Sequence, residues 1–138
     1  MDPNKKSTTI SIKQGCMLPG TTRQVYELWM DEKKHAEVTG GKATISRAVG
    51  GEFATFGGWA TGKNIELNPD KKIIQTWRAD DWPAGHFSTL TVHLLPAPGG
   101  TKLLFTQTGV PIERAKSVAV GWKEYYWEPM KKFLINNK

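Results

Sequence analysis

The three histidines are the side chains of this sequence best suited to metal binding or to acid–base chemistry near neutral pH. They are His35, His86 and His93. No two of them stand four residues apart, the spacing at which two histidines on one helix bind zinc together. His86 could meet the carboxylates of Asp80 and Asp81 at a metal ion, but loop carboxylates usually face solvent. We therefore predict no metal site.

His86 and Arg78 each have two possible roles. His86 directly follows the segment Trp82–Gly85, so its ring can fold under this loop in a structural hydrogen bond. A ligand contact or an acid–base role is the alternative. Arg78 follows Trp77 in a predicted strand, where it either anchors an anionic group inside a cavity or points outward to Asp80.

The remaining candidates for chemistry are weak. Glu52 and Glu66 alternate with apolar residues in predicted strands, so both are expected to face solvent rather than to act as a general acid. Cys16 has no neighbouring histidine and closes a predicted strand, which favours a buried structural thiol. No phosphate-binding loop, dinucleotide fingerprint or nucleophile elbow is present. We expect no catalytic residue, no cofactor and no enzymatic activity.

Aromatic residues are the more informative set, because six tryptophans are many for 138 residues. Core packing is the simple interpretation, and the alternative is that some of them line a pocket or contact a partner. We predict a cavity lined by Phe53, Trp59, Trp77, Trp122 and Tyr126. On an α-helical wheel Trp127 lies opposite Trp122, so it is a partner contact if exposed and a core residue if buried.

These residues lie on elements of an α+β protein. A strand is predicted over Thr8–Leu18, followed by a helix that Thr21 or Thr22 caps and that runs to about Met30, and by a short helix over Asp31–Val38. Six short strands then follow one another through tight turns, as in an antiparallel meander. Their predicted ranges are Lys42–Val49, Glu52–Phe56, Trp59–Leu67, Lys71–Ala79, His86–Leu95 and Thr101–Thr108.

The last element is a long C-terminal helix with an aromatic stripe. Its apolar positions are Val118, Trp122, Tyr125, Tyr126, Pro129 and Phe133, which are predicted to share one side, and Pro129 is expected to kink it. The sheet is the only large apolar surface available to this stripe. We therefore predict a curved antiparallel sheet wrapped around the C-terminal helix, with a cavity between them as the default ligand site.

Composition narrows the classes of function. The net charge is +6, but the basic residues do not cluster and no nucleic-acid motif accompanies them, so nucleic-acid binding is not expected. No run of about 20 apolar residues is present that could span a membrane. A single cysteine excludes an internal disulfide. We expect a cytoplasmic protein with a single domain over residues 8–136 and a flexible tail over residues 1–7.

Several motifs occur in the order typical of a known family. They are Gly50–Phe53, Gly62–Leu67, Lys72–Arg78, the Trp-Pro-x-Gly-His-type segment Trp82–Thr89, Gly109–Pro111 and the Gly-Trp-x-x-Tyr-Tyr segment Gly121–Trp127. With them, residues 8–135 resemble the activators of the heat-shock protein 90 ATPase, specifically their C-terminal-type domain. The resemblance implies the helix-grip fold of the START-like (SRPBCC) superfamily and contact with a chaperone of that class.

We therefore interpret the chain as a non-catalytic binding domain. Its partner is either a heat-shock protein 90 class chaperone, as the family implies, or a small apolar ligand such as a lipid, polyketide or flavonoid held in the cavity. The candidate ligand-binding residues are Phe53, Trp59, Trp77, Arg78, His86, Trp122 and Tyr126. The candidate partner-binding residues are Trp82, Lys123 and Trp127.

Overall fold

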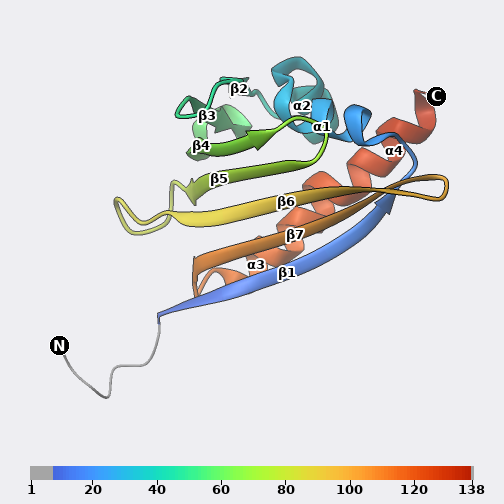
Figure 1. Cartoon of the computed structure of the whole chain (residues 1–138). Helices are drawn as coiled ribbons and strands as arrows, with labels where there is room; N and C mark the ends of the chain where they lie inside the picture. The colour runs from blue at the N-terminus through green and yellow to red at the C-terminus, as the bar shows by residue number, and fades with distance from the viewer. Residues whose placement is uncertain (1–7, 138) are drawn as a thin grey trace.

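Seven antiparallel strands form one curved sheet in the computed structural model, which describes residues 8–137 (Figure 1). The strand order is β1-β7-β6-β5-β4-β3-β2, so the first strand pairs with the last one along the sheet edge. The strands are β1 (Thr9–Leu18), β2 (Thr44–Ile45), β3 (Glu52–Thr55), β4 (Ala60–Asn68), β5 (Lys72–Ala79), β6 (Ser88–Ala97) and β7 (Gly100–Pro111). The predicted tail over residues 1–7 lies outside the described residues.

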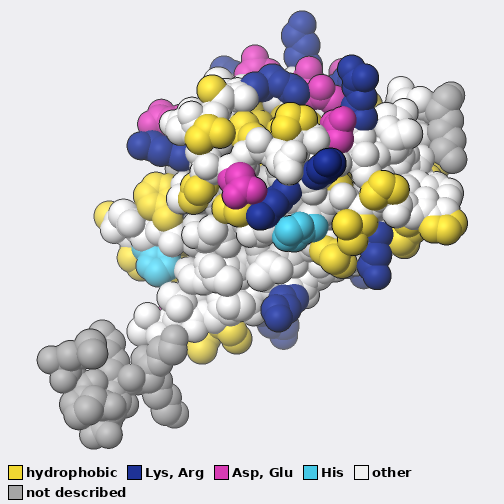
Figure 2. All heavy atoms as spheres, viewed as in Figure 1, with side chains coloured by type: hydrophobic (Ala, Val, Ile, Leu, Met, Phe, Trp, Pro, Cys, Tyr) yellow, Lys and Arg dark blue, Asp and Glu magenta, His cyan; other side chains and the backbone are white. Residues whose placement is uncertain are grey.

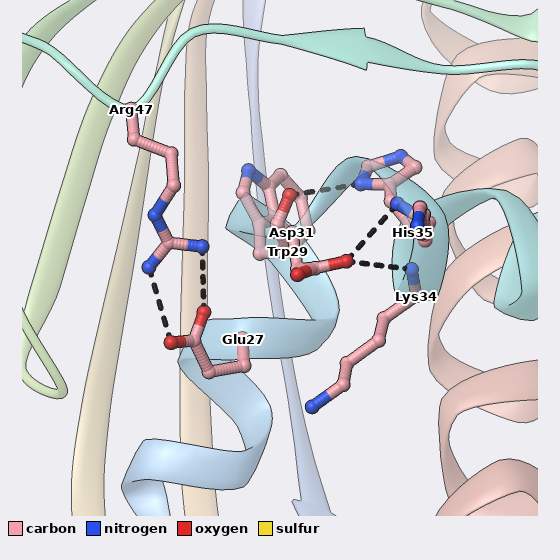
Figure 3. Close-up of polar contacts among 7 residues, drawn as sticks. Glu27, Trp29, Asp31, Lys34, His35 and Arg47 are labelled. Carbon is pink, nitrogen blue, oxygen red and sulfur yellow. Dashed lines mark hydrogen bonds and ion pairs between the residues drawn. The ribbon is translucent and has the colours of Figure 1, made fainter.

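Two short helices, α1 (Thr22–Met30) and α2 (Glu32–Thr39), connect β1 to the rest of the sheet. Thr21 begins α1 with a capping box in which Gln24 is the reciprocal partner. Asp31 ends α1 and caps α2, because its carboxylate accepts hydrogen bonds from the backbone N–H groups of Lys33 and Lys34, each at 3.0 Å (Figure 3). The capping residues thus fix the sharp corner between the two helices.

The C-terminal helical segment crosses one face of the sheet (Figure 1). It comprises α3 (Ala115–Trp122), a π-helical turn η2 (Lys123–Trp127) and α4 (Glu128–Asn136). In the π turn the N–H of Glu128 donates to the carbonyl of Lys123, five residues earlier. Pro129, which has no N–H, lies in the first turn of α4. The wider turn therefore occurs directly before the residue at which a kink was predicted.

Burial follows the expected alternation on the sheet. Along β5, Ile73, Gln75, Trp77 and Ala79 are buried, whereas the residues between them are half-buried on the other face. The core lies between this inner face and the helices. Figure 2 views the molecule from the side of the sheet away from the C-terminal helical segment. In this view charged side chains gather at the end of the molecule where α1, α2 and β2 lie. The predicted α+β architecture is confirmed.

Several predicted strand boundaries are wrong. The strand expected from His86 begins at Ser88, so His86 lies in the preceding loop. The strand expected over Lys42–Val49 is reduced to Thr44–Ile45, because the side-chain amide of Asn64 binds the carbonyls of Ser46 and Ala48 instead. The strand expected from Trp59 begins at Ala60, since a 3-10 turn, η1 (Phe56–Gly58), precedes it. None of the described helices is long and apolar enough to cross a membrane.

Candidate functional site

A half-open aromatic pocket of about 360 Å³ lies where α3 and η2 face the end of β5. Its wall is mostly apolar. Trp77 comes from β5, Trp122 and Tyr126 come from the C-terminal helical segment, and Trp59 closes one side. The lining residues are Phe56, Trp59, Trp77, Asp81, Trp82, Arg114, Ser117, Val118, Gly121, Trp122, Tyr125 and Tyr126. Four of the seven predicted ligand-binding residues therefore share one pocket: Trp59, Trp77, Trp122 and Tyr126.

The loop after β5 forms a second wall through Trp82. This side chain is only 4% exposed and packs edge-on against Trp77, with ring centroids 5.3 Å apart. Two hydrogen bonds hold the loop in place. The Nη2 atom of Arg78 donates to the Trp82 carbonyl at 2.9 Å, and Nε2 of His86 donates to the Gly109 carbonyl at 2.7 Å. The loop is thereby fixed to both β5 and β7.

Arg78 and His86 thus shape the pocket without lining it. The guanidinium of Arg78 lies over the Phe87 ring at 5.9 Å, turned neither into the cavity nor to Asp80. The His86 ring makes the structural hydrogen bond that was one of its two predicted roles. Phe53 also lies outside the pocket and lines a smaller chamber behind it.

The candidate partner contacts separate by burial. Lys123 is exposed on the helix surface, whereas Trp82 and Trp127 are both nearly sealed, at 4% and 5% exposure. Trp127 packs against Trp122 in a stacked arrangement, with centroids 6.0 Å apart. Residues five apart on an α-helix differ in direction by roughly 140°. The π turn brings them back to the same side, because five residues complete about one of its turns.

Inward-facing glutamines pair with the core tryptophans, a feature that sequence reasoning missed; Gln75 and Gln107 are buried and Gln14 is half-buried. Each indole N–H donates to a glutamine carbonyl oxygen on a different strand. The pairs are Trp29 with Gln75 on β5 (3.0 Å), Trp122 with Gln107 on β7 (2.7 Å) and Trp127 with Gln14 on β1 (2.7 Å). The available signal was a glutamine at an inward position of an alternating strand, where an apolar residue is expected.

The small chamber behind the pocket, with a volume of about 10 Å³, contains a polar pair that was also missed. In the ring of His35, Nδ1 lies 2.9 Å from the Trp29 carbonyl oxygen (Figure 3) and Nε2 lies 2.9 Å from the Tyr126 hydroxyl. A carbonyl only accepts, so Nδ1 carries the proton and Nε2 accepts from Tyr126. Burial lowers the pKa of His35 and raises the pKa of Tyr126, which keeps both groups neutral.

The outer rim of the pocket combines exposed rings with one ion pair. Trp59 is 41% exposed, although large aromatic side chains are usually more buried. Tyr125 is 51% exposed, so its predicted place on the inward stripe of the C-terminal helix is wrong. Asp81 and Arg114 face each other across the rim, with Oδ2 and Nε 3.6 Å apart. Exposed aromatic rings beside a preformed apolar pocket are typical of a binding surface.

The arrangement supports binding better than acid–base chemistry. The polar groups of the pocket lie at its rim, and His35 and Tyr126 are enclosed behind it. Among residues 8–137, no three His, Cys, Asp or Glu side chains converge in a way that could hold a metal ion. Glu52, one of the weak catalytic candidates, is exposed and pairs across the strands with Lys63, away from the pocket.

Comparison with known proteins gives a consistent result. Residues 20–134 match the family described as Activator of Hsp90 ATPase homolog 1-like protein. The chain is 31% identical to activator of 90 kDa heat shock protein ATPase homolog 1 of Homo sapiens over 108 residues, covering 78% of this chain and 32% of that protein. It is 32% identical over 122 residues to the homolog of Dictyostelium discoideum, covering 88% of this chain and 32% of that protein.

Solved structures agree on the fold. A crystal structure of an HSP90 activator from Plasmodium falciparum has a TM-score of 0.78 at 22% identity, and covers 93% of this chain and 96% of that one. A protein from Mesorhizobium loti has a TM-score of 0.80 at 18% identity, and covers 94% and 99%. Because the identities are this low, these neighbours show the shared helix-grip fold alone. The chain spans about a third of the length of the curated relatives it matches.

Proposed function

The chain belongs to the family of Activator of Hsp90 ATPase homolog 1-like proteins, and from this membership we propose a non-catalytic domain that binds a chaperone of the heat-shock protein 90 class and modulates its ATPase. The match over residues 20–134 carries the proposal, and the names of the relatives from Homo sapiens, Dictyostelium discoideum and Saccharomyces cerevisiae support it. Those relatives are about three times as long as this chain. That this chain by itself changes the ATPase rate of the chaperone is therefore part of the proposal. We assign the activity to the cytoplasm.

The proposed contact surface is the exposed side of the C-terminal helical segment next to the pocket rim. Tyr125 and Trp59 expose aromatic rings there, and Lys123 adds a positive charge on the same helix. Tryptophan and tyrosine contribute disproportionately to protein–protein affinity, and a charge at the rim steers a partner of opposite charge. Trp82 keeps a supporting role beneath this surface, because it is buried against Trp77.

Calorimetry against an N-terminal–middle fragment of such a chaperone tests the proposal, together with the ATPase rate of the full-length chaperone. We expect saturable binding and a changed ATPase rate. Lys123→Glu should weaken binding several-fold, whereas Lys102→Glu on β7 should not, because Lys102 lies in the sheet rather than on the helical segment. Absence of binding, combined with an unchanged ATPase rate at high concentration of this chain, would refute the proposal.

A second candidate function is the carriage or sensing of a small apolar molecule. The observation that favours it is the preformed aromatic pocket of about 360 Å³, which falls within the size range of small-molecule sites. Titration with naphthalene, followed by two-dimensional NMR, tests it directly. Shifts of the indole signals of Trp77 and Trp122 would support the function, and unchanged spectra at saturating naphthalene would exclude it for aromatic hydrocarbons.

A further inference from the structure

Aromatic rings enclose the pocket beside α3 and η2 from several directions. Seven of its twelve lining residues are aromatic, and four of these are tryptophans. Neighbouring rings meet edge to face rather than in parallel stacks. The interplanar angle is 86° between Phe56 and Trp59 and 74° between Trp59 and Trp77. Rings at such angles form walls that face different directions, so the space of about 360 Å³ in front of them is a half-open aromatic cage.

Phe56 reaches this cage through an unusual backbone conformation. Its φ angle is 54°, in the left-handed region that a bulky side chain rarely adopts. Gly57 and Gly58 follow with φ angles of 66° and 100°, which glycine adopts without strain. The Phe56 ring lies beside the Tyr125 ring, with centroids 5.6 Å apart, and both line the pocket. Backbone strain of this kind clusters at ligand-binding sites, so the position of the Phe56 ring favours a ligand in the cage.

Asp81 is the only acidic side chain that lines the pocket. Its Oδ2 atom lies 3.6 Å from Nε of Arg114, which is too far for a hydrogen bond, and both side chains are about half exposed. Ser117, another polar lining residue, donates its hydroxyl proton to the backbone carbonyl of Arg114. The carboxylate of Asp81 is therefore available at the mouth of the pocket to a second cation.

An organic cation suits this cage better than other charged groups. The π face of an aromatic ring attracts a cation, and tryptophan does so most strongly. A primary ammonium carries three N–H donors, and the apolar walls offer few acceptors for them besides Asp81. A quaternary ammonium group has no N–H, and its methyl groups contact the rings directly. An anion would lose its hydration against the rings and would be repelled by Asp81.

We propose that the pocket binds a trimethylammonium group, held by the rings of Trp59, Trp77 and Tyr125, with Asp81 as its counter-charge. The group is compact and occupies the space in front of the rings, so no packed pair of rings has to separate. Arg114 competes with it for the carboxylate of Asp81. This ligand class goes beyond both candidate functions, because the ligand is neither a chaperone surface nor an uncharged apolar molecule.

Choline and dimethylbutanol test the proposal by two-dimensional NMR titration at constant ionic strength. Dimethylbutanol has the shape of choline, with a neutral carbon in place of the charged nitrogen. We expect choline to shift the indole signals of Trp59 and Trp77 and to bind roughly 10-fold more tightly than dimethylbutanol. A short peptide that contains trimethyl-lysine carries the same group on a protein. Tighter binding of this peptide than of choline would identify a protein side chain as the source of the group, and weaker binding would identify a small molecule.

Three variants separate the charge of Asp81 from the shape of the pocket. Asp81→Asn keeps the shape and should weaken choline binding several-fold while leaving dimethylbutanol binding unchanged. Asp80→Asn is the matched control, because Asp80 is an exposed neighbour that does not line the pocket. Arg114→Gln removes the competing cation and should strengthen choline binding by roughly 2- to 5-fold.

Two outcomes would overturn the inference. If choline binds no better than dimethylbutanol, or if Asp81→Asn and Asp80→Asn change choline binding equally, the pocket does not select a cation, while the second candidate function survives. If neither probe binds, the inference also fails, and titration with naphthalene still decides the second candidate function by itself. NMR spectra of each variant establish that it is folded.

Discussion

The two ends of the interface between helix and sheet use the same kind of side chain to opposite effect. At the β1 end, Trp127 is buried, stacks against Trp122 and donates its N–H to Gln14. At the β4–β5 end, Trp59 is 41% exposed and the rings surround an open space of about 360 Å³. A tryptophan becomes part of the core where its ring is packed on all sides and its N–H is hydrogen-bonded. It forms a binding surface where part of the ring has no packing neighbour.

The largest expected effect is loss of a ring from the closed end. Trp127→Ala should lower the free energy of unfolding by about 3–5 kcal/mol, because a buried aromatic side chain is replaced by a cavity. It also leaves Gln14 without its indole partner. Urea denaturation followed by circular dichroism measures this. A loss below about 1 kcal/mol would mean that this end is not closely packed in solution.

The glutamine partner of Trp122 gives the next largest effect. Gln107→Leu should cost about 1–3 kcal/mol, since the buried N–H of Trp122 and the hydroxyl of Ser88 both lose a bond. The double variant Trp122→Phe/Gln107→Leu should be less destabilised than the sum of the two single variants, because the leucine then faces no unpaired indole. Strict additivity in the denaturation series would show that the hydrogen bond contributes nothing.

A fall in pH should destabilise the protein through His35, which lines the small chamber. Burial lowers the pKa of His35, so the unfolded chain binds a proton more readily than the folded chain. The free energy of unfolding should therefore decrease as the pH falls below the ordinary histidine pKa of about 6.5, and level off below the lowered pKa. His35→Gln should flatten this dependence, while His93→Gln on β6, where the ring is exposed, should retain it.

The smallest effect on stability is expected at the open end. Trp59→Ala should change the free energy of unfolding by less than about 1 kcal/mol, because much of the ring already faces solvent. The same substitution should weaken naphthalene binding several-fold, since the ring closes one side of the pocket. A stability loss as large as that of Trp127→Ala would erase the difference between the two ends of the interface.

Prediction from sequence succeeded where local patterns decide the outcome. The alternation along β5 correctly indicates that Trp77 faces inward, and the short helix predicted over Asp31–Val38 is present as Glu32–Thr39. It failed where a distant side chain intervened. Asn64 captures the carbonyls of Ser46 and Ala48 across 18 and 16 residues of chain, which no pattern within Lys42–Val49 reveals.

The candidate site was half predictable for the same reason. Aromatic residues on the apolar face of their element, such as Trp77, Trp122 and Tyr126, were identified because the spacing of apolar residues indicates which face is buried. The direction in which Trp127 points depends on a π turn. Such a turn rotates every later side chain about the helix axis relative to its position on an α-helical wheel. His35 was missed, since a histidine at a buried position has no distinctive spacing.

The sequence by itself determined the order and type of the elements, the aromatic stripe and the family, because these depend on residues near each other along the chain or on ordered motifs. Only the tertiary structure decided which tryptophans are sealed and which surround a space. That outcome depends on how well the volumes of side chains from distant strands and helices fill the interface. It also depends on which buried N–H groups find partners there, such as Gln14 for Trp127.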